Sequence, residues 1–227
     1  MGSVSSKPSA VLWDMDGTLV DTEPYWMSAE TALVEFYGGT WTHEDALELV
    51  GSGLHGSAVI LQRHGVRMEA DAIVQRLTDD VAARLRTEGV PFRPGARALL
   101  SELKAEGIPS ALVTMSLKRM AREVVALIDF PAFELVLGGD EAPRPKPHPD
   151  PYLQAARMLG IDIADAVVIE DSMTGVAAGR ASGAVTLGVP HIVPLDGSAA
   201  HELWPSLDGR TVADIRALHA RHSKEAA

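Results

Sequence analysis

A run of apolar residues that ends in two carboxylates places the strongest constraint on the fold of this chain. Residues 10–13 read Ala-Val-Leu-Trp and lead directly into Asp14, Met15, Asp16 and Gly17. A short apolar run of this kind is typical of a buried strand. Two like charges this close together are each more stable when neutral or beside a cation. An Asp16-Gly17 turn would explain only the end of the strand. The whole cluster indicates a divalent cation between carboxylates, one of which is free to attack an electrophile.

The later part of the chain alternates between strand and helix patterns. Beyond the first strand, we expect strands at residues 110–113, 135–137, 166–169 and 184–188, with a helical pattern between each pair. Strands that alternate with helices form parallel, doubly wound sheets with right-handed crossovers. The sequence therefore predicts an α/β fold with a doubly wound parallel sheet.

A purely helical segment interrupts this alternation directly after the first strand. Residues 21–91 carry helical patterns only, with Pro24 suited to a first helical turn and Thr22 suited to cap it. We expect a discontinuous α/β core domain of residues 10–20 and 92–227, and an all-helical cap domain of residues 21–91. The two links between these domains would lie close together, which would let the cap move as a lid.

Composition narrows the classes of function. The formal net charge of -11 over 227 residues argues against a nucleic-acid surface, which needs a basic face. The chain has no cysteine, which excludes disulfides and thiolate chemistry and fits a reducing compartment. No apolar run approaches the roughly 20 residues of a membrane helix. We expect a cytoplasmic monomer without nucleic-acid or membrane partners, preceded by a disordered arm of residues 1–9.

Polar side chains follow the strands that we expect next to the first one. The residues after the second, third and fourth strands are Thr114 and Ser116, Lys146, and Glu170 with Asp171. Singly, each has a structural explanation, such as a helix cap or a solvated loop lysine. Because ligands bind outside the carboxyl ends of strands in open α/β sheets, we expect these side chains to share one pocket with Asp14 and Asp16.

These residue types suit phosphoryl transfer, which depends mainly on positioning and on charge neutralisation. A site of oxygen ligands without Cys or His is typical of Mg²⁺. Lys146 would add a second positive charge, and Thr114 with backbone amides at helix starts would hold phosphate oxygens. The predicted cofactor is Mg²⁺, and the predicted ligand is a small phosphorylated metabolite.

Taken in chain order, the motifs resemble those of the haloacid dehalogenase superfamily of phosphatases, in the branch related to β-phosphoglucomutase with a helical cap. The matching positions, motif by motif, are Asp14 and Asp16, Thr114, Lys146, and Glu170 with Asp171. The resemblance implies that Asp14 is the nucleophile that forms an aspartyl-phosphate. It implies that Asp16 protonates the leaving oxygen and then activates water. Asp14, the backbone carbonyl of Asp16, Glu170 and Asp171 would bind the metal.

The resemblance also implies substrate contacts. Thr114, Met115 and Lys146 would bind the transferring phosphate, although many relatives have Asn where this chain has Met115. Candidates for contact with the leaving group are Asp21, Glu23, Trp26 and His55. For Trp26 the alternative is a place in the core of the cap, and for His55 it is an exposed helix surface.

Two alternatives to a hydrolase stay open. Mutases of the branch carry a His where this chain has Trp26, and an Arg on a cap loop where residues 51–56 have none. Both differences favour a hydrolase of a sugar phosphate, nucleotide or similar metabolite. A receiver-like signalling module would also combine acids, a Thr and a Lys. The helical insert and Asp16 argue against it, because a lasting acyl phosphate disfavours a nearby base.

Overall fold

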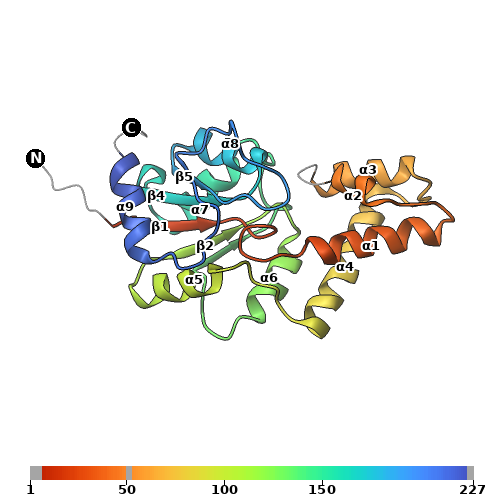
Figure 1. Cartoon of the computed structure of the whole chain (residues 1–227), viewed down its shortest axis with the longest axis horizontal. Coiled ribbons are helices and arrows are strands. Elements are labelled where there is room, and N and C mark those ends of the chain that lie inside the picture. Colours follow the sequence, from red (N-terminus) through yellow and green to blue (C-terminus); the bar gives the residue numbers. More distant parts are fainter. Residues whose placement is uncertain (1–6, 50–52, 224–227) are drawn as a thin grey trace, which may run out of the picture.

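The computed structural model describes residues 7–49 and 53–223, which form a sheet covered by helices and a further group of helices to one side (Figure 1). The strands are β1 (Ala10–Trp13), β2 (Ser110–Val113), β3 (Leu135–Leu137), β4 (Ala166–Glu170), β5 (Val185–Gly188) and β6 (Glu202–Leu203). All neighbours are parallel, in the order β3-β2-β1-β4-β5-β6. The predicted doubly wound α/β fold is confirmed. The sequence patterns did not indicate β6, which is only 2 residues long.

Helices cover both faces of the sheet. One face carries α5 (Ala96–Ala105), α6 (Lys118–Ala126) and α9 (Val212–His222), and the other carries α7 (Asp150–Leu159) and α8 (Met173–Ser182), with a 3₁₀ turn (Ile163–Asp165) before β4. Side chains alternate along β1. Val11 and Trp13 pack in the core on the first face, and Ala10 and Leu12 pack on the second. All of β1 is buried, as a central strand covered on both faces requires.

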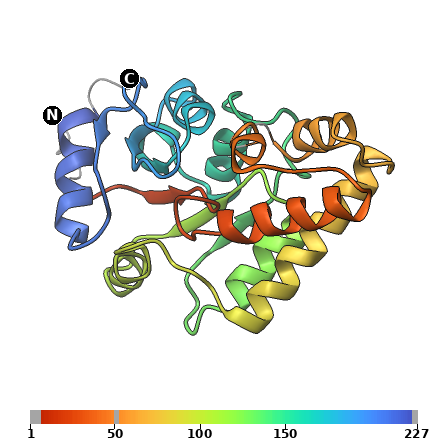
Figure 2. The ribbon, with the colours of Figure 1, turned by 45° about the vertical axis from the view of Figure 1, so that its right-hand side comes forward.

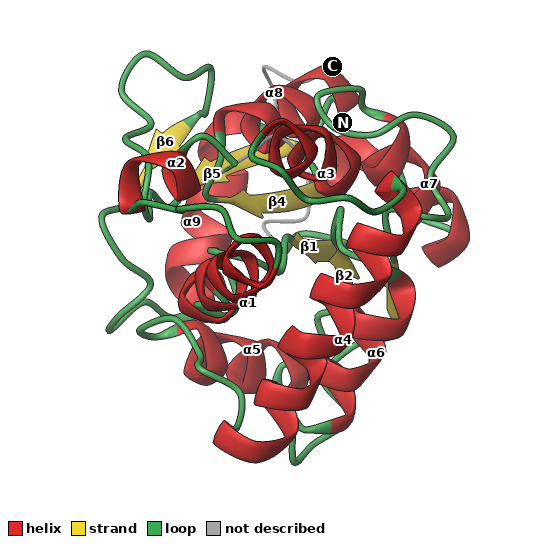
Figure 3. Cartoon of the chain, turned by 90° about the vertical axis from the view of Figure 1, so that its right-hand side faces the viewer, coloured by secondary structure: helices red, strands yellow, loops and turns green. Residues whose placement is uncertain are grey.

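Four helices follow β1 before the chain returns to the sheet. They are α1 (Glu23–Phe36), α2 (His43–Leu47), α3 (Leu54–Arg63) and α4 (Ala70–Glu88), and we call them the helical insert. Apolar side chains such as Leu33, Leu61 and Leu77 form the interior of the insert. Because β1 leads into α1 and all strands are parallel, the insert lies beyond the carboxyl ends of the strands (Figures 1 and 3).

The two chain segments that join the insert to the sheet run side by side. The backbone N–H of Asp21 donates to the carbonyl oxygen of Pro91 at 2.7 Å, and that of Arg93 donates to Leu19 at 2.9 Å. Helix α4 lies beside both α1 and α6 (Figure 2). The division into core and cap domains, with a moving lid, stays a prediction. Adjacent links are the arrangement that such a movement requires.

The start of the described chain is packed against the sheet. The Lys7 ammonium donates to the carbonyl oxygens of Glu106 and Gly107 at 3.1 and 3.0 Å. The backbone N–H of Ser9 donates to Asp165 at 2.7 Å. The predicted disordered arm therefore does not extend over residues 7–9, and its remaining part lies outside the described residues. Within those described residues, no helix is both long and apolar enough to cross a membrane.

Candidate active site

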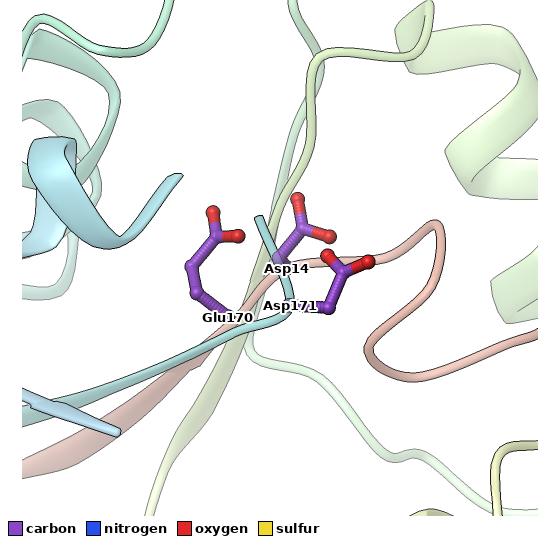
Figure 4. Close-up of side chains that lie close together, drawn as sticks. All are labelled: Asp14, Glu170 and Asp171. Carbon is purple, nitrogen blue, oxygen red and sulfur yellow. The ribbon is translucent and has the colours of Figure 1, made fainter. Parts of the chain in front are cut away.

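Three carboxylates meet where two central strands end. Asp14 follows β1, Glu170 is the last residue of β4, and Asp171 comes next (Figure 4). One ligand oxygen from each lies within 4.8 Å of the others. The strand order reverses between β1 and β4, which is the position where open α/β sheets bind ligands. We call these residues the acidic cluster. Their oxygen donors fit a hard divalent cation.

A buried lysine joins the acidic cluster from the loop after β3. The Nζ of Lys146 lies 2.6 Å from an oxygen of Asp14 and 2.6 Å from one of Glu170, and it donates to the Val113 carbonyl at 3.0 Å. Only 4% of its side chain is exposed. Burial alone would lower the pKa of Lys146, but the Asp14 and Glu170 charges outweigh it and raise the pKa above its usual value. Lys146 is therefore an ammonium.

Negative charge in the acidic cluster exceeds what one lysine neutralises. Burial, followed by the charge of Glu170, raises the pKa of Asp14 to about 7 against the opposing effect of Lys146. Burial, then Asp14 and Glu170, raise the pKa of Asp171 well above its usual range, although the Thr18 hydroxyl donates to it at 3.1 Å. A cation between these groups would remove the cost of keeping them ionised.

Asp16 lies apart from the acidic cluster and is surrounded by donors from the sheet and from the insert. Its Oδ1 accepts from the Thr22 hydroxyl at 2.5 Å and from the Trp26 indole at 3.3 Å. Its Oδ2 accepts from Ser116 at 2.7 Å and from Thr114 at 3.4 Å. Thr22 is the N-cap residue of α1, as predicted, but its side chain makes no capping hydrogen bond because its hydroxyl donates to Asp16. The Asp16 side chain links the sheet to the insert.

Two glycines allow the backbone to approach the acidic cluster closely. Gly17 has φ of 84°, in the left-handed region, and a Cβ there would overlap the Asp171 carboxylate. A Cβ on Gly175, in α8, would overlap the Glu170 carboxylate. Ser172 caps α8 by accepting from the Gly175 backbone at 3.0 Å. The absence of a side chain at these two glycines leaves room for both carboxylates.

A cavity of about 620 Å³ opens above the acidic cluster, between the sheet and the insert. The predicted site residues that line it are Asp14, Asp16, Glu23, Trp26, His55, Thr114, Met115, Lys146 and Asp171. Glu170 is fully buried beneath it. The Met115 sulfur accepts a hydrogen bond from the Lys146 backbone N–H at 3.4 Å. A thioether has no donor hydrogen, so only the backbone N–H of Met115 could donate to a phosphate.

Two of the predicted leaving-group contacts lie elsewhere or at the margin. Asp21 is not among the described residues that line the cavity, and its carboxylate lies 2.9 Å from His191, far along the sequence. His55 lines the cavity, yet 69% of its side chain is exposed and it lies 2.9 Å from Asp71. The structure thus places Asp21 at the link between sheet and insert.

Two residues near the site, Glu30 and Tyr152, were not predicted as site residues from the sequence. Glu30 lines the cavity with only 6% of its surface exposed. Its spacing from Glu23 and Trp26 puts all three on one face of α1, a signal that could have found it. Tyr152, fully buried, donates its hydroxyl to Glu170 at 2.6 Å, and the Lys146 ammonium lies 5.0 Å from its ring centre.

A sequence model of a hydrolase family, the haloacid dehalogenase-like hydrolases, matches residues 8–183. The chain belongs to this family. Among curated relatives in the family, Hexitol phosphatase A of Escherichia coli (strain K12) is 36% identical over 183 residues, covering 78% of this chain and 81% of that protein. Phosphoglycolate phosphatase of Neisseria meningitidis is 32% identical over 202 residues, covering 83% of each. These findings confirm the predicted phosphatase of the haloacid dehalogenase superfamily.

Solved structures of haloacid dehalogenase-like enzymes share the fold. CbbY from Rhodobacter sphaeroides, in complex with xylulose-(1,5)bisphosphate, superposes with a TM-score of 0.80 at 25% identity, covering 88% of this chain and 95% of that one. The chain spans half the length of the bifunctional riboflavin kinase/FMN phosphatase of Arabidopsis thaliana, with 30% identity over 193 residues.

Proposed function

We propose that this enzyme is a Mg²⁺-dependent phosphomonoester hydrolase of a small phosphorylated metabolite, acting through an aspartyl-phosphate on Asp14. The observation that carries the proposal is the 2.6 Å contact between Asp14 and the buried Lys146 ammonium, beside Asp171 on the floor of the cavity. A nucleophilic carboxylate can approach an anionic phosphate only where positive charge is gathered beside it.

The proposed metal site uses the acidic cluster. Asp14, Glu170 and Asp171 would hold Mg²⁺, joined by the backbone carbonyl of Asp16 as the family resemblance implies. When bound, the ion neutralises charge on the phosphoryl oxygens. The donor set supports this assignment because it contains carboxylate oxygens and no sulfur or imidazole.

In the first step, a carboxylate oxygen of Asp14 attacks phosphorus and the bond from phosphorus to the ester oxygen breaks. Asp16 transfers its proton to the departing oxygen, which leaves as an alcohol. Lys146 neutralises charge on the transferring group, and the Thr114 hydroxyl is positioned to donate to one of its oxygens. The three hydroxyl partners of Asp16 can accept as well as donate, so they tolerate either protonation state.

In the second step, the Asp16 carboxylate takes a proton from water while the water oxygen bonds to phosphorus. The bond from phosphorus to the Asp14 oxygen then breaks, releasing phosphate and restoring both side chains. The insert, through residues such as Trp26 and Leu77, covers the cavity and would limit the entry of bulk water.

The charges of the cavity bear on the substrate. Lys146 is the one lysine or arginine among the described residues that line it, and two carboxylates already engage it. This supports a sugar or sugar-alcohol phosphate, as in the name Hexitol phosphatase, over a substrate with a second anionic group such as phosphoglycolate. A phosphomutase is the second candidate, because a putative β-phosphoglucomutase from Thermotoga maritima shares the fold with a TM-score of 0.70 at 27% identity.

The test is phosphate release from p-nitrophenyl phosphate and from a panel of sugar phosphates, sugar-alcohol phosphates, nucleoside monophosphates and phosphoglycolate. We expect steady release with Mg²⁺, loss of release with EDTA, and recovery when Mg²⁺ is restored in excess. Release that is unchanged by EDTA would contradict the metal requirement. Slow release combined with bisphosphate-stimulated isomerisation of a sugar phosphate would favour the mutase.

A further inference from the structure

The part of the cavity that the insert lines combines apolar side chains with carboxylates. Its apolar lining includes Trp26, Leu49, Leu54 and Leu77. Among the described residues that line the cavity, none in this part is a lysine or an arginine, and the exposed His55 lies 2.9 Å from Asp71. A group entering this part of the cavity therefore meets no lysine or arginine that could pair with a second negative charge.

Glu30 is mostly buried, and its carboxylate has no protein partner among the described residues. Only 6% of the residue is exposed, and it lines the cavity. Within the part of the chain that the structure describes, its side chain has neither a hydrogen bond nor an ion pair. Burial, followed by the charge of Glu23, raises the pKa of Glu30 to about 8. A carboxyl group that lines the cavity without a protein partner is available to hydrogen-bond a ligand that enters.

Glu23, Trp26 and Glu30 follow one another along a single face of α1, and all three line the cavity. Glu23 lies near Asp16. Burial, followed by the charge of Asp16, raises the pKa of Glu23 to about 7. Seven residues of helix rise separate the two glutamates by about 10 Å along the axis. A molecule that reaches from the catalytic floor to Glu30 must therefore be several bonds long.

Resting on the proposed function, we infer that Glu30, together with Glu23, selects phosphate esters whose leaving group is an extended, uncharged polyhydroxyl chain. The two glutamates would hydrogen-bond hydroxyl groups of that chain, and the Trp26 ring would cover its C–H surface. A second phosphate or a carboxylate on the leaving group would meet two carboxyl groups and no cation, and would be rejected. A short leaving group would not reach Glu30.

The experiment compares four substrates, D-sorbitol 6-phosphate, glycerol 1-phosphate, phosphoglycolate and fructose 1,6-bisphosphate, on the full chain with Mg²⁺. We expect the wild-type kcat/KM for sorbitol phosphate to exceed that for phosphoglycolate and that for fructose 1,6-bisphosphate by about tenfold or more. A tenfold difference is what one lost hydrogen bond or one unpaired charge would cause. We expect Glu30→Met to lower kcat/KM for sorbitol phosphate by about tenfold, mainly through KM, and to leave glycerol phosphate within about twofold.

Two further variants separate a specificity role from a structural one. Glu30→Gln keeps a hydroxyl acceptor, so we expect it to retain more sorbitol phosphate activity than Glu30→Met, and it carries the test if the Met variant does not fold. Glu35→Gln, exposed on the same helix, should change nothing.

The outcomes distinguish this inference from the proposed function. A wild type that releases phosphate but prefers an anionic leaving group would overturn the inference alone. A Glu30→Met variant that lowers the rates for sorbitol and glycerol phosphates equally would also overturn it. A wild type that hydrolyses no phosphate ester with Mg²⁺ would instead overturn the proposed function.

Discussion

The indole nitrogen of Trp26 lies 3.3 Å from a carboxylate oxygen of Asp16. Trp26 belongs to the first helix of the insert, and Asp16 belongs to the loop after the central strand of the sheet. This hydrogen bond, with that from Thr22 to the same oxygen, connects the insert directly to the residue that we propose as acid and base. The position of the insert and the orientation of Asp16 are therefore coupled.

The Trp26→Phe substitution should test this coupling. Phenylalanine fills most of the space but lacks the N–H donor, so we expect kcat to fall by about fivefold on every substrate, with little change in KM for short ones. Trp41→Phe is a matched control in the insert, because no described residue bonds to the Trp41 indole nitrogen. Equal effects of the two substitutions would show that Asp16 does not depend on Trp26.

The Lys146→Met substitution should expose the repulsion within the acidic cluster. Removing a buried cation that contacts two carboxylates should destabilise the fold by about 3 kcal/mol without divalent metal, and Mg²⁺ should restore part of the loss. Thermal melting with and without Mg²⁺ measures both effects. Lys104→Met, which removes a surface pair with Glu134, should cost less than about 1 kcal/mol. A metal-free Lys146→Met protein that melts with the wild type would contradict the account.

Much of the fold could be predicted from the sequence because its elements carry strong local patterns. The apolar run of β1 and the polar residues that follow strands, such as Asp171 and Lys146, predict a parallel sheet and a shared pocket at one edge. The contact of Asp21 with His191 could not be predicted, because those residues are 170 positions apart and no local pattern links them. Thr22 lies at the N-cap of α1 as predicted, but the sequence does not reveal Asp16 as the tertiary partner that takes its hydroxyl hydrogen bond.

The sequence also could not predict the direction in which a helix side chain faces. Glu30 sits at a helical spacing from Trp26, yet the sequence alone does not reveal that this face of α1 closes a cavity rather than meeting solvent. Acidic residues on helices are mostly exposed, so burial of Glu30 becomes visible only when the insert is packed against the sheet.

Glu30→Gln should stabilise the protein increasingly as pH rises. The pKa of Glu30 is raised to about 8 in the folded protein from an ordinary 4.5. Between these values the unfolded state is ionised and the folded state is not, so the wild type loses stability as pH increases, by several kcal/mol at most. Glutamine does not titrate. We expect the melting temperature of the variant, relative to the wild type, to rise from pH 5 to pH 8 and then level off.

The control for this pH dependence is Glu35→Gln, whose side chain is exposed on the same helix. Its difference in melting temperature from the wild type should stay nearly constant with pH. If the Glu30→Gln difference is equally flat, then Glu30 does not ionise with a raised pKa and the buried position of its carboxyl group would be refuted.

Tyr152→Phe should reveal how firmly Glu170 is held. The substitution removes the 2.6 Å hydrogen bond to a fully buried carboxylate while keeping the ring beside Lys146. We expect a loss of about 1–3 kcal/mol in stability and a several-fold increase in the Mg²⁺ concentration needed for half-maximal activity. An unchanged Mg²⁺ requirement would mean that Tyr152 contributes packing alone.

The most direct test of the central claim is phosphate release from p-nitrophenyl phosphate, with saturating Mg²⁺, by the wild type and by Asp14→Asn. The amide is nearly isosteric with the carboxylate but is not a nucleophile, so the variant should fold. We predict that its rate falls by about a thousandfold or more. An Asp14→Asn protein that releases phosphate at the wild-type rate would contradict the proposal that Asp14 attacks the phosphoryl group.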